Sequence, residues 1–183
     1  SKNDNLYKSL KNKKQKVFRG SENDVLGRFY NTAKKFRASA IVRITADCPL
    51  VDSKIVDYCI KMYKKNKFEY LSNLFYPSFP DGFDVEIFSS KLLELAYSKA
   101  TTNFDREHVT TYMKRMGKIK KGNFYNNANL SGYKLTLDYQ EDIENIKAIY
   151  DFFKPNIYFS FNDIIKSFLK KKNRKSILKT AIV

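Results

Sequence analysis

The early part of the chain alternates between stretches with the hydrophobic spacing of strands and a stretch with that of a helix. Residues 17–18 form a short apolar run, and Gly20-Ser21 after it is a signal for a loop and a helix start. Apolar residues recur at helical spacing over residues 25–36, and residues 38–45 are mostly apolar and β-branched. Pro49 then stops the second strand, because proline has no N–H to donate to a ladder. The pattern predicts a strand–helix–strand unit of the βαβ type.

The rest of the chain contains further elements of both kinds. Asp52-Ser53 is a helix-capping signal before an apolar stripe that reaches Tyr63, and Lys154-Pro155 ends a later helical pattern. Strand-like or helix-like patterns also occupy residues 68–72, 83–87, 102–116, 133–138, 138–153 and 161–169. No internal repeat is visible. The alternation of strands and helices predicts an α/β fold.

Two aspartates stand at the ends of predicted strands. In open α/β sheets, ligands bind beyond the carboxyl ends of the strands, and Asp47 lies at such an end. Asp138 ends the strand-like residues 133–138, and Glu141 follows it three residues later. From the pattern alone, Asp138 is the N-cap of the next helix. Asp47 is therefore the first candidate for chemistry.

Two further segments carry polar residues with both a structural and a functional interpretation. Asp81-Gly82 is a turn signal, and Asp84 and Glu86 then share one face of a predicted half-buried strand. The pattern alone favours a polar outer face. His108 is the only histidine and lies in the first turns of a helix whose cap is Thr102 or Asp105. It is usual for such a histidine to be structural, while the alternative is contact with an anion.

Composition sets the class of protein. The chain has 183 residues, 43% of them hydrophobic and 15% aromatic, which predicts one folded domain over 1–183. Residues 73–130 are expected to form a small excursion that covers the sugar side of the site or makes a dimer contact. Cys48 and Cys59 lack metal-ligand spacing and suit a reduced, cytoplasmic protein without a membrane span.

The net charge of +16 raises the alternative of a nucleic-acid-binding module. The lysines gather before the first predicted strand and in a basic tail over 170–183, and such runs are usually solvated ends. The sequence contains no RNP-type aromatic box, no zinc-finger spacing and no basic zipper. Nucleic acid is therefore the least favoured partner.

Five segments resemble, in order, the motifs of one family: GSENDVLGRF, RITADCPLVD, PDGFDVEIFS, DREHVTTY and LTLDYQEDIE. They are similar to those of the cytidylyltransferase-like proteins typified by spore coat polysaccharide biosynthesis protein F. The resemblance spans roughly residues 17–150. It implies a nucleotide-diphospho-sugar transferase fold, Rossmann-like, with a mostly parallel sheet and helices on both faces. It also implies CTP, a sugar acid or modified sugar as acceptor, and Mg²⁺.

The resemblance implies a role for each candidate residue. Asp47 and Asp138 are expected to be catalytic and to hold the metal ion. The residues expected to bind the nucleotide are Arg19, Gly20, Ser21 and Arg43. Those expected to bind the sugar are Asp81, Gly82, Asp84, Glu86, Arg106, Glu107 and His108.

One motif of the family is missing ahead of the first predicted strand. Related proteins open with a strand and a Gly/Arg/Lys loop that holds the triphosphate, and here the first glycine is Gly20. We expect either an N-terminally truncated chain or a member that has lost this loop. The alternative to an enzyme is a non-catalytic subunit that binds sugar, nucleotide or a partner protein. The sequence leaves the oligomeric state open, with a homodimer among the options.

Overall fold

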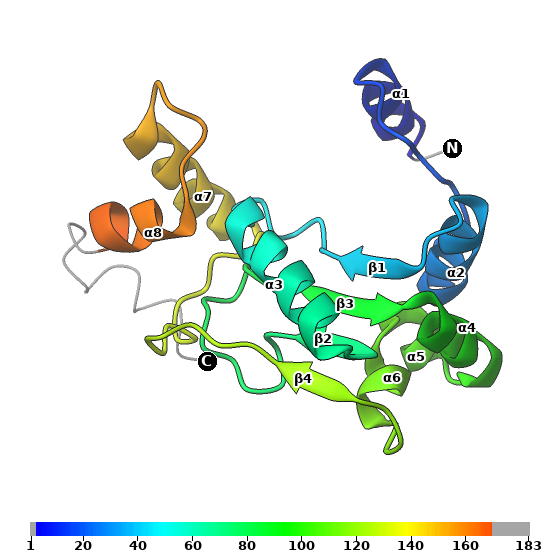
Figure 1. The fold of residues 1–183 in the computed structure, drawn as a ribbon. Coiled ribbons are helices and arrows are strands. Elements are labelled where there is room, and N and C mark those ends of the chain that lie inside the picture. Colours follow the sequence, from blue (N-terminus) through cyan, green and yellow to red (C-terminus); the bar gives the residue numbers. More distant parts are fainter. Residues whose placement is uncertain (1–2, 170–183) are drawn as a thin grey trace. The chain divides into compact units, whose positions relative to one another are not determined.

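The structure is a computed structural model that describes residues 3–169 (Figure 1). Within them the chain divides into two compact units, residues 3–41 with 89–118 and residues 42–88 with 119–169. We call these unit 1 and unit 2 and describe each by itself. Among the described helices, none combines the length and the apolar character that crossing a membrane requires. The predicted tail over 170–183 lies outside the described residues.

Unit 1 is helical. Its elements are α1 (Asp4–Asn12), α2 (Val25–Lys35), α4 (Ser90–Lys99), α5 (Asn103–His108) and α6 (Thr111–Arg115). Helix α2 packs against α4 and α5. Asp24 caps α2 by accepting the Gly27 N–H at 2.9 Å, and it also pairs with Arg106 of α5. The rings of Tyr30 and Tyr97 stack at 4.2 Å between α2 and α4.

The helix predicted over 25–36 is confirmed by α2, whereas the strand predicted at 17–18 is wrong. Residues 17–18 are irregular and only partly buried, because a two-residue apolar run without a pairing strand cannot form a ladder. Of the two caps expected for the helix after residue 101, Thr102 is the N-cap.

A buried carboxylate organises the region around α5 and α6. Asp105 is 1% exposed and is paired with Arg115. The hydroxyls of Thr102 and Thr111 donate to its two oxygens at 2.8 and 2.7 Å. The hydrogen bonds from Arg115, with those from the two threonines, outweigh burial and hold the pKa of Asp105 well below its ordinary value of 3.8.

We expect Asp105→Asn to destabilise the protein by roughly 1.5–3 kcal/mol at pH 7, the size of a hydrogen bond to a charged group. A carboxyl with a lowered pKa stabilises the fold above its unfolded-state pKa, and this contribution disappears as the pH falls through the folded-state value. In urea unfolding, the free energy of unfolding should therefore fall less between pH 5 and pH 2 in the variant than in the wild type. Exposed Glu94→Gln on α4 is the control. An equal acid sensitivity of Asp105→Asn and wild type would contradict this.

Unit 2 contains most of the sheet. The four strands are β1 (Ala40–Arg43), β2 (Tyr70–Ser72), β3 (Glu86–Ser89) and β4 (Lys121–Asn123), in the order β1-β3-β2-β4. Strand β2 pairs antiparallel with β3 and parallel with β4, so the sheet is mixed. The remaining elements of this unit are α3 (Ser53–Asn66), α7 (Gln140–Phe153), α8 (Phe161–Asp163) and the π-helix η1 (Ile164–Leu169). The expected α/β class is confirmed.

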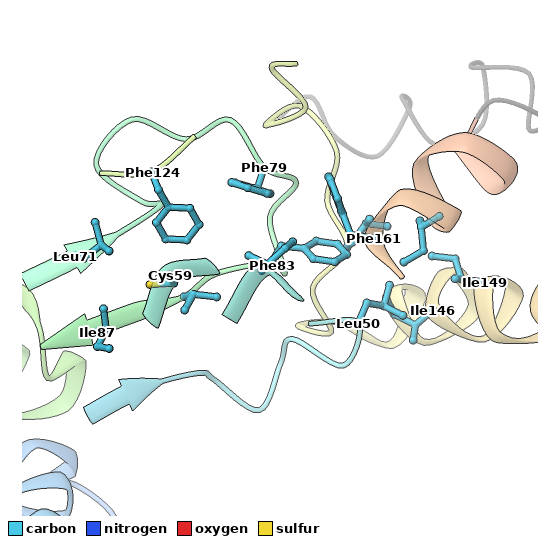
Figure 2. Packing of buried hydrophobic residues seen from close by; sticks show 14 residues of the cluster. Leu50, Cys59, Leu71, Phe79, Phe83, Ile87, Phe124, Ile146, Ile149 and Phe161 are labelled. Atoms are coloured by element: carbon cyan, nitrogen blue, oxygen red, sulfur yellow. The ribbon is translucent and has the colours of Figure 1, made fainter. Parts of the chain in front are cut away.

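The core of unit 2 joins the sheet to α3, α7 and α8 (Figure 2). Leu71 and Ile87 of the sheet lie beside Cys59 of α3. The ring of Phe83 meets that of Phe161 at 4.9 Å, edge to face. This contact connects the segment before β3 to the start of α8.

Local signals at two helix ends in unit 2 are confirmed. Asp52 caps α3 by accepting the Lys54 N–H at 2.7 Å, and α7 ends at Lys154-Pro155. The predicted cap of α7 is wrong by one residue. Tyr139 is the N-cap, and the Asp142 carboxylate accepts both its N–H and that of Asp138, at 2.8 and 2.9 Å.

The strands predicted on either side of the candidate site differ from the observed ones. The strand predicted at 83–87 is shifted to β3, and Glu86 is buried rather than on a polar outer face. Residues 133–138 form no ladder, only a single parallel bridge between Lys134 and Asp81. Burial does not follow the alternation of a half-buried strand here, because Leu135 and the polar Thr136 are both buried while Leu137 is exposed.

Candidate active site

Asp47 and Asp138 are brought together by the backbone of unit 2. The Leu137 N–H donates to the Asp47 carbonyl at 2.8 Å, so the residue before Asp138 is hydrogen bonded to Asp47. Asp47 follows β1 in the loop to α3, and Asp138 precedes α7. Two carboxylates that are 91 positions apart in the sequence thus share one end of the unit.

Asp81 joins this pair through close backbone packing. Its N–H donates to the Tyr133 carbonyl at 3.0 Å, and its carbonyl accepts the Leu135 N–H at 2.8 Å. Gly82, at φ +104°, makes the approach possible, since a Cβ there would lie 2.5 Å from the Leu135 oxygen. The turn signal in the sequence therefore marks a site of close contact between two chain segments.

We expect Gly82→Ala to destabilise the protein by roughly 1–3 kcal/mol and to displace Asp81 from residues 133–136. The added Cβ meets backbone atoms that cannot move like a side chain, and the positive φ adds strain. Urea unfolding measures the loss, and Gly132→Ala is the matched control because nothing lies within 4 Å of its Cβ position. Equal stability of the two variants would refute the close approach.

The three carboxylates form a site of concentrated negative charge. Burial raises the pKa of Asp81, and the charges of Asp138 and Asp47 raise it further, while Thr136 and Lys134 lower it. The Thr136 hydroxyl lies 2.8 Å from Asp138 Oδ2 and 3.4 Å from Asp81 Oδ2. Because it has one proton, it can satisfy one of these carboxylates at a time. The remaining charge favours a bound cation.

Cys48 belongs to the packing of the site rather than to its chemistry. Its Sγ lies 3.3 Å from Thr45 Oγ1 and 3.5 Å from Asp47 Oδ1. Burial, together with the charges of Asp47 and Asp84, raises the pKa of the thiol to about 11. At neutral pH the thiol is protonated, and it is a poor nucleophile in that form. Asp84 is partly buried near this thiol.

Arg43 and Glu86 form an ion pair between β1 and β3. Glu86 is 1% exposed, and it accepts hydrogen bonds from Arg43 and from the Tyr70 hydroxyl. The Arg43 Nε is buried and has no hydrogen-bond partner in the described part of the chain. This arrangement joins the three neighbouring strands β1, β3 and β2.

Asn73 is a positioning residue that the sequence patterns did not single out. Its side chain is 2% exposed, donates to the Phe83 carbonyl at 2.8 Å and accepts the Val85 N–H at 3.0 Å. The amide thus fixes the segment that leads from Asp81 to β3. A polar residue directly after the buried strand β2 was the available signal.

The other predicted residues lie in unit 1. Arg19 pairs with Asp4 at 2.8 Å, and together with Gly20 it lines an open pocket of about 410 Å³. The Ser21 Oγ accepts the Asp24 N–H at 3.0 Å, a local hydrogen bond within the loop before α2. The partners of Arg19 and Ser21 in these contacts therefore come from α1 and from the residue that caps α2.

The expected sugar-binding residues of α5 also have local partners. Arg106 is paired with Asp24, donates to the Tyr97 carbonyl at 3.0 Å and lies over the Tyr97 ring. The exposed His108 ring packs against Phe104 at 4.3 Å, and Glu107 is exposed. Within unit 1, Arg106 therefore joins α2, α4 and α5.

The carboxylates of the candidate site fit a Mg²⁺ ion whose remaining ligands come from a substrate. Within residues 3–169, no group of three His, Cys, Asp or Glu side chains is arranged to hold a metal ion by itself. Mg²⁺ in nucleotide enzymes is usually held by one or two carboxylates and by the phosphates of the substrate. Asp47 and Asp138, with Asp81 nearby, match this incomplete kind of site.

Comparison with known proteins shows the family to which the chain belongs. A family model described as cytidylyltransferase matches residues 2–174. The chain belongs to the cytidylyltransferase family. The spore coat polysaccharide biosynthesis protein SpsF of Bacillus subtilis is 32% identical over 141 residues, which are 74% of this chain and 57% of that protein. The resemblance inferred from the five motifs is thereby confirmed.

Two further relatives agree. An uncharacterized protein of Methanocaldococcus jannaschii is 42% identical over 97 residues, 53% of this chain and 39% of that protein. A structure described as a cytidylyltransferase from Leptospira borgpetersenii matches with a TM-score of 0.86 and 37% identity, over 92% of this chain and 71% of that one. The matches thus span 39% and 57% of the lengths of the two curated relatives. The expected nucleotide-sugar transferase fold is confirmed.

Proposed function

We propose that this chain carries the metal-binding carboxylates of an enzyme that transfers a cytidylyl group from CTP to a sugar acid or modified sugar. A hydroxyl of the sugar attacks the α-phosphorus and loses its proton to water, the bond from that phosphorus to the oxygen shared with the β-phosphate breaks, and pyrophosphate leaves with that electron pair. The observation that carries the proposal is the meeting of Asp47, Asp81 and Asp138 in a chain of the cytidylyltransferase family.

Asp47 and Asp138 would hold Mg²⁺, which when bound neutralises the charge of the triphosphate and of the leaving group. The remaining work of this chain is positioning, which is the main requirement of phosphoryl chemistry. Asp81 and Asp84 would accept hydrogen bonds from sugar hydroxyls. The nucleotide contacts expected of Arg19, Gly20 and Ser21 stay a prediction from the family resemblance.

The buried partners in unit 2 support a different role for two of the candidates. The Glu86 carboxylate is covered and satisfied by Arg43 and Tyr70, so a sugar hydroxyl does not reach it without breaking a buried ion pair. We propose that Arg43 and Glu86 hold the strands beneath the site in place and touch no substrate.

The product would be a CMP-activated sugar for a surface polysaccharide or glycan. The name of the Bacillus subtilis relative refers to the biosynthesis of spore coat polysaccharide, which supports this class of pathway. The identity of the sugar depends on side chains that contact it, and an assay with several sugar acids is the direct way to find it.

The test uses the protein that carries this chain, with CTP, ATP, GTP or UTP, a panel of sugar acids, and either Mg²⁺ or EDTA. We expect pyrophosphate release only with CTP, a sugar and Mg²⁺ together, and a CMP-sugar mass in the products. Sugar or CTP binding without turnover under every condition would overturn the proposal and favour a non-catalytic binding subunit.

A further inference from the structure

Lys134 bridges two carboxylates at the edge of the proposed metal site. Its Nζ lies 2.6 Å from Asp142 Oδ2 and 3.1 Å from Asp138 Oδ2, and it sits over the Tyr139 ring at 4.8 Å. The shorter contact is the one to Asp142. Since Asp142 also accepts the N–H groups of Asp138 and Tyr139, it is the fixed anchor for the lysine.

The carboxylate of Asp138 is held on one side only. Its Oδ2 accepts the Thr136 hydroxyl at 2.8 Å and contacts Lys134, while its Oδ1 has no hydrogen-bond partner in the part of the chain that the structure describes. The side chain is 40% exposed. One oxygen is therefore left for a ligand from solvent, and the longer contact with Lys134 is the easier one to give up.

The charge around these groups is unbalanced. Asp47 and Asp138 raise the pKa of Asp81 by their charge, and Lys134 is the cation that lowers it. Lys134 thus contacts two carboxylates, Asp142 more closely than Asp138, and its charge also acts on Asp81. In the protein without a bound metal ion, this ammonium group limits the mutual repulsion of the carboxylates.

We propose that Lys134 is a positioning residue that takes the place of a divalent cation at Asp138 and gives up this carboxylate when the cation arrives. This rests on the proposed function, because it takes Asp138 as a metal ligand. Lys134 then stays on Asp142, close enough for its charge to oppose a cation that binds alone. A triphosphate brings negative charge that offsets the lysine, so the cation is expected to bind well only together with CTP.

The test is Mn²⁺ binding, measured by electron paramagnetic resonance on the whole protein with and without CTP. Without CTP, Lys134→Met should bind Mn²⁺ about fivefold to tenfold more tightly than wild type, the effect of removing one positive charge a few ångströms away. Lys134→Arg should stay close to wild type. Lys65→Met, which removes an exposed lysine from the last turn of α3, is the control for net charge. With CTP present, the difference between Lys134→Met and wild type should shrink.

A second readout concerns stability without metal. Lys134→Met should melt at a lower temperature than wild type in EDTA, and Mn²⁺ should raise its melting temperature more than it raises that of wild type. A purely structural lysine would lower Mn²⁺ affinity or leave it unchanged, and that result would overturn the inference. If wild type binds no Mn²⁺ even with CTP, the proposed function fails as well. If Lys134→Met does not fold, Lys134→Gln makes the same comparison with a polar side chain.

Discussion

Asp47→Asn is expected to lower kcat for pyrophosphate release by about 10²–10³-fold, the size of removing one preorganised charge-stabilising group from an active site. The side chains have nearly the same shape, but the amide carries no charge and is a weak ligand for Mg²⁺. The main-chain hydrogen bond from Leu137 to the Asp47 carbonyl is unaffected by this change. The fold should therefore be retained.

The loss should be specific to the carboxylate cluster. Asp138→Asn is expected to have an effect of similar size, and the double variant should be little worse than either single one, because both residues serve one bound ion. Asp57→Asn, on the exposed face of α3, is the control and should leave kcat unchanged. A steady-state pyrophosphate assay at saturating CTP makes the comparison. Full activity of Asp47→Asn would rule out the metal-ligand role.

Arg43→Met is expected to destabilise the protein by about 3 kcal/mol, because it leaves the Glu86 carboxylate buried without its charged partner. We take the low end of the usual range because the Arg43 side chain is 19% exposed and admits some water, whereas that of Glu86 is 1% exposed. The Tyr70 hydroxyl remains as a donor to Glu86 but cannot balance its charge.

The double variant Arg43→Met with Glu86→Leu distinguishes the stability contributed by the ion pair as a whole from the cost of leaving Glu86 without its partner. Apolar replacement of both partners should recover most of the stability lost by Arg43→Met, since a buried pair as a whole often contributes little. Urea unfolding of wild type, both single variants and the double variant measures the coupling. Lys154→Met, which breaks the exposed pair with Asp151, is the control and should not change stability beyond experimental error. Additive losses in the cycle would show that Arg43 and Glu86 act independently.

The helices illustrate which features can be inferred from the residues alone. The apolar stripe of α2, the Asp52 cap of α3 and the end of α7 before Pro155 were all predicted, because caps and periodicity depend on neighbours within one or two turns. The cap of α7 was placed one residue early. There the Asp138 carboxylate accepts the Thr136 hydroxyl and contacts Lys134 instead of capping the helix, and Asp142 accepts the N–H groups of Asp138 and Tyr139.

The candidate site was predictable in its members and not in its contacts. Asp47 was visible as an acidic residue after a buried strand, and the order of the family motifs pointed to Asp138. The burial of Glu86 was not visible, because its partner Arg43 is 43 positions away and the alternation around it is that of an ordinary half-buried strand. The role of Asn73 depends likewise on accepting and donating partners beyond the turn.

Helices such as α2 and α3, the family and the acidic residues worth testing are determined by the sequence by itself, because they depend on local spacing and on motifs of a few residues. The tertiary structure decided which of those residues meet: Asp81 lies beside residues 133–136 only because Gly82 lets two distant segments touch, and Lys134 finds Asp138 and Asp142 in the same place. Such contacts join residues whose separation along the chain carries no signal, so only the folded packing brings the charges together.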